Sequence, residues 1–196
     1  MRRVNPFETG IDQDNYYIHL ARYMFCVRQL KKTQSVLEIG CGIGYGARLL
    51  SDYAQEVYAT DTETSLQEAW NKYDKENLHF VTNIDQIDDL KKFDVVVSFE
   101  VVEHIEENDL EQYFKLINSR VKPNGFVFMS TPRAVPFEER SKNRQIEHKI
   151  EYSPDEFRAL LEKNFKNVFL FAQNDAIISV QNLNMAWNLV AICIPF

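Results

Sequence analysis

A buried strand followed by a turn in which every second residue is glycine has the residue types of a ligand cradle. The strand is predicted over Val36–Ile39 and the next helix over Tyr45–Tyr53. Glycine adopts positive φ without strain and has no Cβ, so a ligand can approach the backbone of Gly40, Gly42 and Gly44. The helix points unpaired N–H groups at the same place. The sequence therefore predicts a binding site for a small ligand here.

An acid, Glu38, stands two positions before the first glycine. The run reads Glu38-x-Gly40-x-Gly42-x-Gly44, and Gly46 only extends the alternation, so the G-x-G-x-x-G spacing of dinucleotide-binding folds is absent. A carboxylate under the turn can accept hydrogen bonds from a cationic amino group but repels a pyrophosphate. The pattern favours a ligand with an ammonium and a sulfonium over NAD. The alternative is a turn that merely connects a strand to a helix.

The second predicted strand, Glu56–Thr60, ends at another acid, Asp61. A carboxylate at the tip of this strand can accept from both ribose hydroxyls of a nucleoside, and it follows the glycines at the expected separation. Asp61 and the neighbouring Thr62 are therefore predicted to bind a ribose. The alternative is that Asp61 only caps a helix over Thr64–Lys72.

A near-continuous apolar run, Phe93–Glu100, is predicted as a central strand that is covered on both faces. Ligands of open α/β sheets bind at the carboxyl ends of the strands. The residues expected beside the ligand for this reason are Ser98, Phe99, Glu100, Glu103 and His104. Histidine commonly serves as a general base near neutral pH, which makes His104 a candidate for that role. The alternative is that His104 bonds a backbone group and shapes the loop.

The remaining segments alternate between helices and strands. A polar segment over 131–151, which carries His148, is long enough to be a lid or a binding loop. Five strand–helix alternations and two closing strands predict one α/β domain with a doubly wound sheet. The other predicted helices are 14–30, 109–120 and 153–164, and the other strands are 78–81, 126–130, 168–171 and 189–194.

The N-terminal part is predicted as an irregular arm over 1–13 and an amphipathic helix that Asp12 or Asp14 can cap. One interpretation is a helix that only packs on the sheet. The other is a helix at the mouth of the ligand site. The side chains that it would offer to a substrate are Tyr16, Tyr17, His19, Arg22 and Tyr23.

Length and composition limit the class of protein. The chain has 196 residues, the size of one domain, and 45% of them are hydrophobic and 26% charged, as in globular proteins. A net charge of −7 argues against nucleic acid as a partner. The three cysteines form no C-x-x-C pair, so neither a disulfide framework nor a metal site is predicted. No signal peptide or membrane span is recognised, and a cytoplasmic location is expected.

These motifs together resemble the class I S-adenosylmethionine-dependent methyltransferases, in which acid-x-Gly-x-Gly-x-Gly follows the first strand. The likeness is closest to small methyltransferases found with glycan and polysaccharide biosynthesis enzymes. It implies a seven-stranded sheet in which the last strand lies antiparallel between the fifth and sixth. The segments that carry it are 19–25, 42–46, 97–104, 130–132 and 148–157.

The resemblance implies S-adenosylmethionine as cofactor and S-adenosylhomocysteine as product. Family members often carry an acid beside the adenine after the third strand, where this chain has Ile84. The side chain of Asn83 or Asp85 is expected to bind the adenine amino group instead, and the backbone of Ile84 or Asp85 its N1. The alternative is a solvated loop. The predicted cofactor-binding residues are Glu38, Gly40, Cys41, Gly42, Gly44, Tyr45, Asp61, Thr62, Asn83, Ile84, Asp85, Phe99 and Glu100.

The implied reaction transfers a methyl group, with a sugar hydroxyl of a glycan or nucleotide-sugar precursor as the expected acceptor. A hydroxyl needs a group that accepts its proton. The candidates, in order, are His104, Glu103, His19 and His148. The alternatives are another small metabolite or an amine as acceptor, and a non-catalytic protein that only binds S-adenosylmethionine. The sequence leaves the oligomeric state open.

Overall fold

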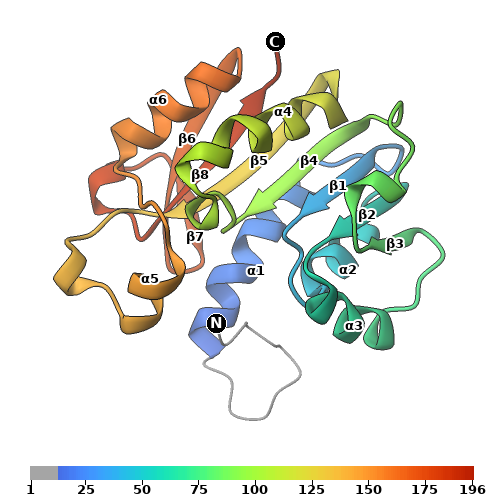
Figure 1. The fold of residues 1–196 in the computed structure, drawn as a ribbon, viewed down its shortest axis with the longest axis horizontal. Helices are drawn as coiled ribbons and strands as arrows, with labels where there is room; N and C mark the ends of the chain where they lie inside the picture. The colour runs from blue at the N-terminus through green and yellow to red at the C-terminus, as the bar shows by residue number, and fades with distance from the viewer. Residues whose placement is uncertain (1–12) are drawn as a thin grey trace.

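The computed structural model describes residues 13–196, and Figure 1 shows its fold. The predicted arm and its Asp12 cap lie outside the described residues. The helices are α1 Gln13–Val27, α2 Tyr45–Ser51, α3 Glu63–Lys72, α4 Leu110–Arg120, α5 Lys142–Glu147 and α6 Pro154–Asn164. The strands are β1 Ser35–Ile39, β2 Glu56–Thr60, β3 Leu78–Val81, β4 Phe93–Phe99, β5 Val121–Pro132, β6 Asn167–Asn174, β7 Ile177–Ser179 and β8 Asn188–Ile194.

Over the described residues these strands form one sheet, in the order β3-β2-β1-β4-β5-β8-β6-β7. The pairs from β3 to β5 are parallel, and β8 lies antiparallel between β5 and β6. The strand order reverses between β1 and β4, the point where ligands of such folds bind. The predicted α/β fold and its antiparallel insertion are confirmed.

The prediction of seven strands missed β7, which pairs antiparallel with the end of β6. Asn174 and Ile177 are partners in this pair, so Asp175 and Ala176 form a two-residue turn, and Asp175 has a φ of 56°. Asx residues adopt this left-handed conformation more readily than most others do. The three residues of β7 are too few to show a clear alternation in the sequence.

The sheet is covered on both faces, as its apolar strands predict. Helices α4 and α6 cross one face, whereas α1 and α2 lie behind the sheet in Figure 1. Alternate residues of β4 serve the two cores: Val95 and Val97 pack with side chains of α1 and α2, whereas Val96 packs with those of α4 and α6. Both layers therefore fix β4, whose carboxyl end lies beside the glycine turn.

Some predicted boundaries are corrected. Helix α1 ends at Val27 instead of Leu30. The strand predicted over 126–130 is longer, because β5 begins at Val121 and ends at Pro132, with a register shift against β4 near its start. The predicted start of α6 is confirmed, because Ser153 caps it in a reciprocal capping box with Glu156.

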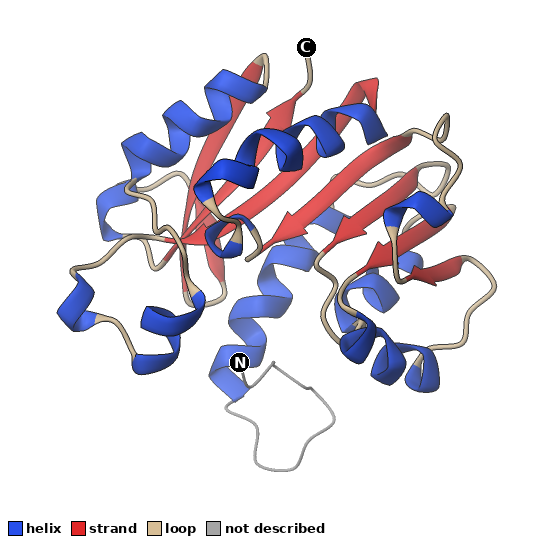
Figure 2. Cartoon of the chain, in the orientation of Figure 1, coloured by secondary structure: helices blue, strands red, loops and turns tan. Residues whose placement is uncertain are grey.

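The polar segment predicted as a loop over 131–151 contains two short helices. They are a 3₁₀ turn, η4 Phe137–Glu139, and the helix α5. In Figure 2 this segment stands at the carboxyl end of the sheet, on the same side as the start of α1. Among residues 13–196 no helix has the length and apolar character needed to cross a bilayer.

Candidate functional site

The glycine turn has the conformation that its sequence predicts. Gly40, Gly42 and Gly44 have φ values of 80°, 56° and 81°. A Cβ added to Gly42 would meet no atom within 4 Å, so its backbone faces open space that a ligand can occupy. A Cβ on Gly40 would instead strike the side chain of Val101, and one on Gly44 would strike Phe80. The turn is therefore closed on its protein side and open on its ligand side.

Glu38 lies buried beneath this turn. Its Oε1 accepts a hydrogen bond of 2.6 Å from the hydroxyl of Tyr23, which comes from α1. Its Oε2 has no hydrogen-bond partner among the described residues. Burial raises the pKa of Glu38 to about 7, against the smaller opposing effect of the Tyr23 hydrogen bond. Such a carboxyl is suited to a cationic donor that brings both a hydrogen bond and a positive charge.

Asp61 joins the tip of β2 to the glycine turn. Its Oδ2 accepts from the backbone N–H of Gly42 at 2.7 Å, and its Oδ1 accepts from that of Thr62 at 2.7 Å. Thr62, rather than Asp61, is the N-cap of α3, so the alternative of a simple helix cap does not describe this residue. The acid positions the backbone that must face the ligand.

A cavity of about 590 Å³ opens in front of the turn. It extends from Asp61 past the end of β4 to α5, so it joins the predicted cofactor cradle to the polar segment. The predicted residues that line it are His19, Arg22, Tyr23, Gly40, Cys41, Gly42, Tyr45, Asp61, Thr62, Phe99, Glu100 and His104. The predicted residues Glu38, Gly44, Glu103 and His148 are not part of this lining. The residues that the sequence did not assign to this site are Ile43, Val101, Ile146, Glu147 and Lys149.

The predicted adenine contacts after β3 lie apart from this lining. Asn83 caps a short 3₁₀ turn, η1 Ile84–Gln86, by accepting from the N–H of Asp85. The side-chain amide of Asn83 also donates to the carboxylate of Asp85 at 3.1 Å. Both polar side chains thus have local partners, and their role toward adenine stays a prediction.

Glu100 follows β4 in a left-handed conformation, with a φ of 56°. Its carboxylate accepts from the hydroxyl of Ser130 at 2.6 Å and from the amide of Asn188 at 2.8 Å. The buried guanidinium of Arg22 lies 4.0 Å from the same carboxylate. Strain at a non-glycine residue persists only where its surroundings hold it. Asn188 was not predicted as a site residue, because it belongs to β8, which is distant from β4 in the sequence.

The Nδ1 lone pair of His19 already accepts a hydrogen bond from Arg22. A guanidinium only donates, so Nδ1 of His19 accepts the 2.9 Å bond from Arg22 and the ring proton lies on Nε2. Burial, and then the charge of Arg22, lower the pKa of His19 to about 4. This arrangement disfavours His19 as the base.

His104 has the opposite arrangement. Its Nδ1 is 3.0 Å from the backbone oxygen of Glu147, which can only accept, so Nδ1 carries the proton and Nε2 carries the lone pair. The ring of His148 stands edge-on to it, with centroids 5.0 Å apart. Two predicted bases that are distant in sequence are therefore neighbours.

Glu103 completes this group. It is 1% exposed, and neither carboxyl oxygen makes a hydrogen bond among the described residues. Burial, and then the charge of Glu100, raise the pKa of Glu103 well above its usual range. The nearby hydroxyl of Thr131 lowers the pKa of Glu103, although it makes no hydrogen bond of ordinary geometry.

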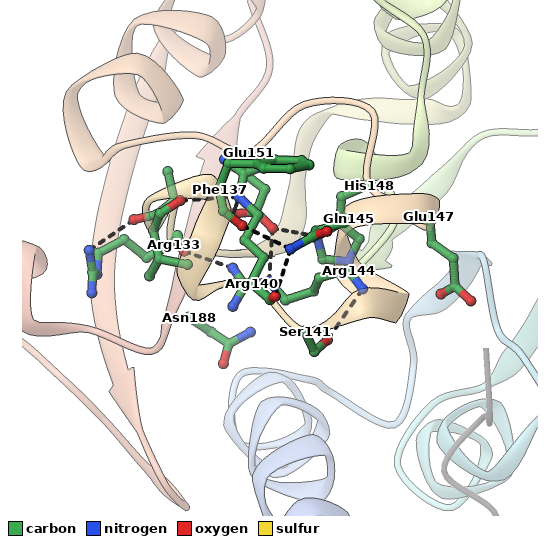
Figure 3. A network of polar contacts seen from close by, with 12 residues as sticks. Arg133, Phe137, Arg140, Ser141, Arg144, Gln145, Glu147, His148, Glu151 and Asn188 are labelled. Carbon is green, nitrogen blue, oxygen red and sulfur yellow. Dashed lines mark hydrogen bonds and ion pairs between the residues drawn. The ribbon is translucent and has the colours of Figure 1, made fainter.

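A buried carboxylate from the polar segment positions His148. Glu151 accepts from Nδ1 of His148 at 2.8 Å, and Arg140 and Arg144 pair with the same carboxylate at 3.1 Å and 2.8 Å. Figure 3 shows this network, with both arginines reaching toward Glu151. Burial opposes the ionisation of Glu151, but the hydrogen bonds from Arg144 and His148 and the charges of both arginines lower its pKa overall. Its bond with the ring therefore places the proton of His148 on Nδ1.

Comparison with known proteins also indicates a methyltransferase. Residues 12–168 match a family profile described as methyltransferase domain. The chain is 30% identical over 138 residues to the ubiquinone biosynthesis O-methyltransferase of Bradyrhizobium diazoefficiens, covering 67% of this chain and 52% of that protein. It is 34% identical over 100 residues to the enzyme of the same name from Rickettsia conorii, covering 49% and 34%. The chain spans about half the length of these relatives, or less.

Solved structures share the fold. The complex of DhpI with SAH has a TM-score of 0.65 at 20% identity, covering 93% of this chain and 95% of that one. The methyltransferase domain of bacterial CtHen1-C has a TM-score of 0.72 at 18% identity, covering 91% and 98%. None of the names of these four proteins refers to glycan or polysaccharide biosynthesis, so that predicted association gains no support.

The residues present fit S-adenosylmethionine. The open face of Gly42 allows close approach, and the unpartnered Oε2 of Glu38 suits the ammonium of a methionine moiety. Asp61 stands at the strand tip where ribose hydroxyls are held in such folds. With the family profile matching most of its length, the chain belongs to the class I S-adenosylmethionine-dependent methyltransferases.

Proposed function

We propose that the chain methylates a hydroxyl oxygen of a small aromatic acceptor, with a phenol as the acceptor group. The observation that carries this proposal is that one cavity joins the glycine turn to the lone pair of His104. S-adenosylmethionine supplies an electrophilic methyl group on a sulfonium. The relatives named O-methyltransferases support oxygen as the acceptor atom.

The proposed division of labour follows the cavity. Glu38, the glycine turn and Asp61 hold the cofactor, and Tyr45 and Phe99 line the region between cofactor and acceptor. Alignment of the reacting groups supplies much of the rate in such a transfer. A phenol has a pKa near 10, so its proton is within reach of a neutral imidazole, whereas an aliphatic hydroxyl is a weaker acid.

The segment over 131–151 is proposed to cover the acceptor. Ile146, Glu147 and Lys149 line the cavity from this segment, and Ile146 exposes 76% of its surface. An exposed apolar side chain at a cavity mouth favours an acceptor with an apolar ring. Backbone bonds from Lys149 and Ile150 to the oxygen of Glu103 attach this segment to the end of β4.

The test is a panel of acceptors with the purified protein and S-adenosylmethionine. The panel holds catechol and simple phenols, free and nucleotide-linked sugars, and primary amines. Formation of S-adenosylhomocysteine and the mass of the product are measured. Methylation of a phenolic oxygen supports the proposal. A methylated amine or sugar as the best substrate, or cofactor binding without turnover on any acceptor, contradicts it.

A further inference from the structure

Glu103, His104 and His148 form a group whose ligand atoms all lie within 4.8 Å of one another. Glu103 and His104 belong to a 3₁₀ turn, η2 Val102–His104, directly after β4. His148 follows α5. The group contains no cysteine and comes from two distant segments, so the spacing of the cysteines does not predict it.

Both imidazoles present their Nε2 atoms as acceptors. The backbone oxygen of Glu147 fixes the proton of His104 on Nδ1, and the carboxylate of Glu151 does the same for His148. Neither Nε2 makes a hydrogen bond within the described part of the chain. The buried carboxyl of Glu103 adds two oxygens that also lack partners there. Several lone pairs thus converge, and none of them makes a hydrogen bond within the described part of the chain.

The surroundings resemble an outer coordination sphere. Imidazoles that bind metals almost always donate their second N–H to a carboxylate or a backbone carbonyl, and this group contains one of each. Arg140 and Arg144 hold the carboxylate of Glu151, as Figure 3 shows. The ammonium of Lys149, in the same segment, forms an ion pair with Glu106 at 2.9 Å instead of pointing into the group.

We propose that Glu103, His104 and His148 bind a divalent first-row transition-metal cation, such as Mn²⁺, Co²⁺ or Zn²⁺, at the edge of the cavity. Two imidazole nitrogens with one carboxylate suit these ions better than Mg²⁺ or Ca²⁺, which prefer oxygen alone. Three protein ligands leave coordination positions open. His104 lines the cavity, so an open position can face the acceptor.

The role of this cation rests on the proposed function. It would accept the acceptor hydroxyl as a further ligand and lower the pKa of that hydroxyl. The hydroxyl proton passes to water, an electron pair on the oxygen forms the new C–O bond, and the pair of the broken C–S bond stays on sulfur. The metal keeps its oxidation state. In this arrangement Nε2 of His104 is a ligand and no longer a base.

The test uses the full-length protein after treatment with a chelator and dialysis. Co²⁺ is titrated with visible absorption as the readout, and Mn²⁺ and Zn²⁺ by calorimetry. The variants are Glu103→Gln, His148→Asn and the pair His104→Asn/His148→Asn. The matched control is His79→Asn, on β3 against Tyr58 and outside the site. Circular dichroism and S-adenosylhomocysteine binding report on the fold and on the cofactor site.

We expect wild type and His79→Asn to bind one Co²⁺ per chain. Each single variant should bind it at least about tenfold more weakly, and the double variant should show no saturable band. The site is overturned if wild type shows no saturable binding, or if the folded double variant binds as wild type does. Wild type that binds S-adenosylhomocysteine but no metal rejects only the site, whereas wild type that binds metal but no S-adenosylhomocysteine rejects only the proposed function. Turnover that persists fully in chelator rejects the catalytic role.

Discussion

The hydroxyl of Tyr23 donates a 2.6 Å hydrogen bond to Oε1 of Glu38, and this bond joins α1 to the strand before the glycine turn. Burial raises the pKa of Tyr23 far above neutrality, so its hydroxyl remains a donor. The other oxygen of Glu38 is left for a ligand. The N-terminal helix thus contacts the predicted cofactor site in addition to packing on the sheet.

The ionisation of Glu38 should couple the stability of the cofactor-free protein to pH. Its pKa is about 7 when folded, above the ordinary 4.5. The folded state therefore keeps a proton that the unfolded state releases, so stability falls as pH rises from 4.5 and the loss is complete above 7. Urea unfolding at pH 5 and pH 8 measures it. The part due to Glu38 is at most roughly 3 kcal/mol, at 1.36 kcal/mol for each pH unit.

The variant Glu38→Gln isolates this effect from other titrations. The stability of Glu38→Gln relative to wild type should increase between pH 5 and pH 8. S-adenosylhomocysteine should bind wild type more tightly at pH 8, because an ionised Glu38 can pair with its ammonium. A difference in stability that does not change with pH would show that Glu38 titrates normally.

Gly42 in the turn and Gly46 in the first turn of α2 should respond differently to an added methyl group. In Gly46→Ala the new Cβ would overlap the Tyr23 ring, so the ring must move and its bond to Glu38 is lost. Overpacking of this kind costs about 1–3 kcal/mol of unfolding free energy. In Gly42→Ala the methyl enters open space, so the cost to stability is confined to the left-handed φ of 56°, about 1–2 kcal/mol for a residue with a Cβ, and the larger loss should be in cofactor affinity. Equal effects of both variants on stability and on calorimetric binding would contradict this contrast.

Asp61 should matter to the ligand both directly and through the turn. Asp61→Ala removes the acceptor that holds the N–H of Gly42 and the group predicted to bind the ribose. Hydrogen bonds to charged groups are worth about 1.5–3 kcal/mol, so S-adenosylhomocysteine affinity should fall by at least about tenfold. Asp88→Ala, at a distant exposed acid, is the control. Unchanged affinity in a folded Asp61→Ala protein would reduce Asp61 to a structural role.

Local patterns explain why the cofactor half could be predicted from sequence. The strand, the glycines and the acid at its end lie within one strand–turn–helix unit, and the bounds of β2 and β3 were predicted to the residue. The capping residues of α6 are equally local. Each of these features depends on neighbours in the chain, which a sequence displays directly.

The acceptor half depends on contacts between distant segments. His148 reaches His104 because Glu151 and two arginines hold it, and none of these was singled out in the sequence. Asn188 reaches Glu100 only because β8 inserts antiparallel beside β5. Charged residues in a polar segment are usually solvated, so their burial in a network had no local signal.

Removing the carboxylate of Glu151 should destabilise the polar segment. Its side chain is fully buried between Arg140, Arg144 and His148, so Glu151→Ala leaves two cations without their anion. Breaking a buried pair typically costs about 3–5 kcal/mol, and the partial exposure of the arginines places this one at or below the lower end. Urea unfolding measures the change, with the exposed Glu139→Ala as control. A loss no larger than in the control would show that the network contributes little.

His104 and His19 both line the cavity, and their variants should show which of the two takes part in the methyl transfer. His104→Ala removes the lone pair at the acceptor side, whether it acts on the proton or on a cation. Loss of a general base typically lowers the rate by about 10² to 10⁴. Single-turnover measurements with saturating cofactor should show a loss of this order, whereas S-adenosylhomocysteine affinity should stay within a few-fold of wild type.

His19→Ala should have a much smaller effect on that rate. Its Nδ1 lone pair is occupied by Arg22, and a pKa of about 4 makes it a poor proton acceptor at neutral pH. Its loss should mainly free Arg22, which can then move toward Glu100. If His19→Ala abolished turnover and His104→Ala kept it, the proton would leave on the α1 side of the cavity. The group of Glu103, His104 and His148 would then be structural, because its lone pairs would have no part in the reaction.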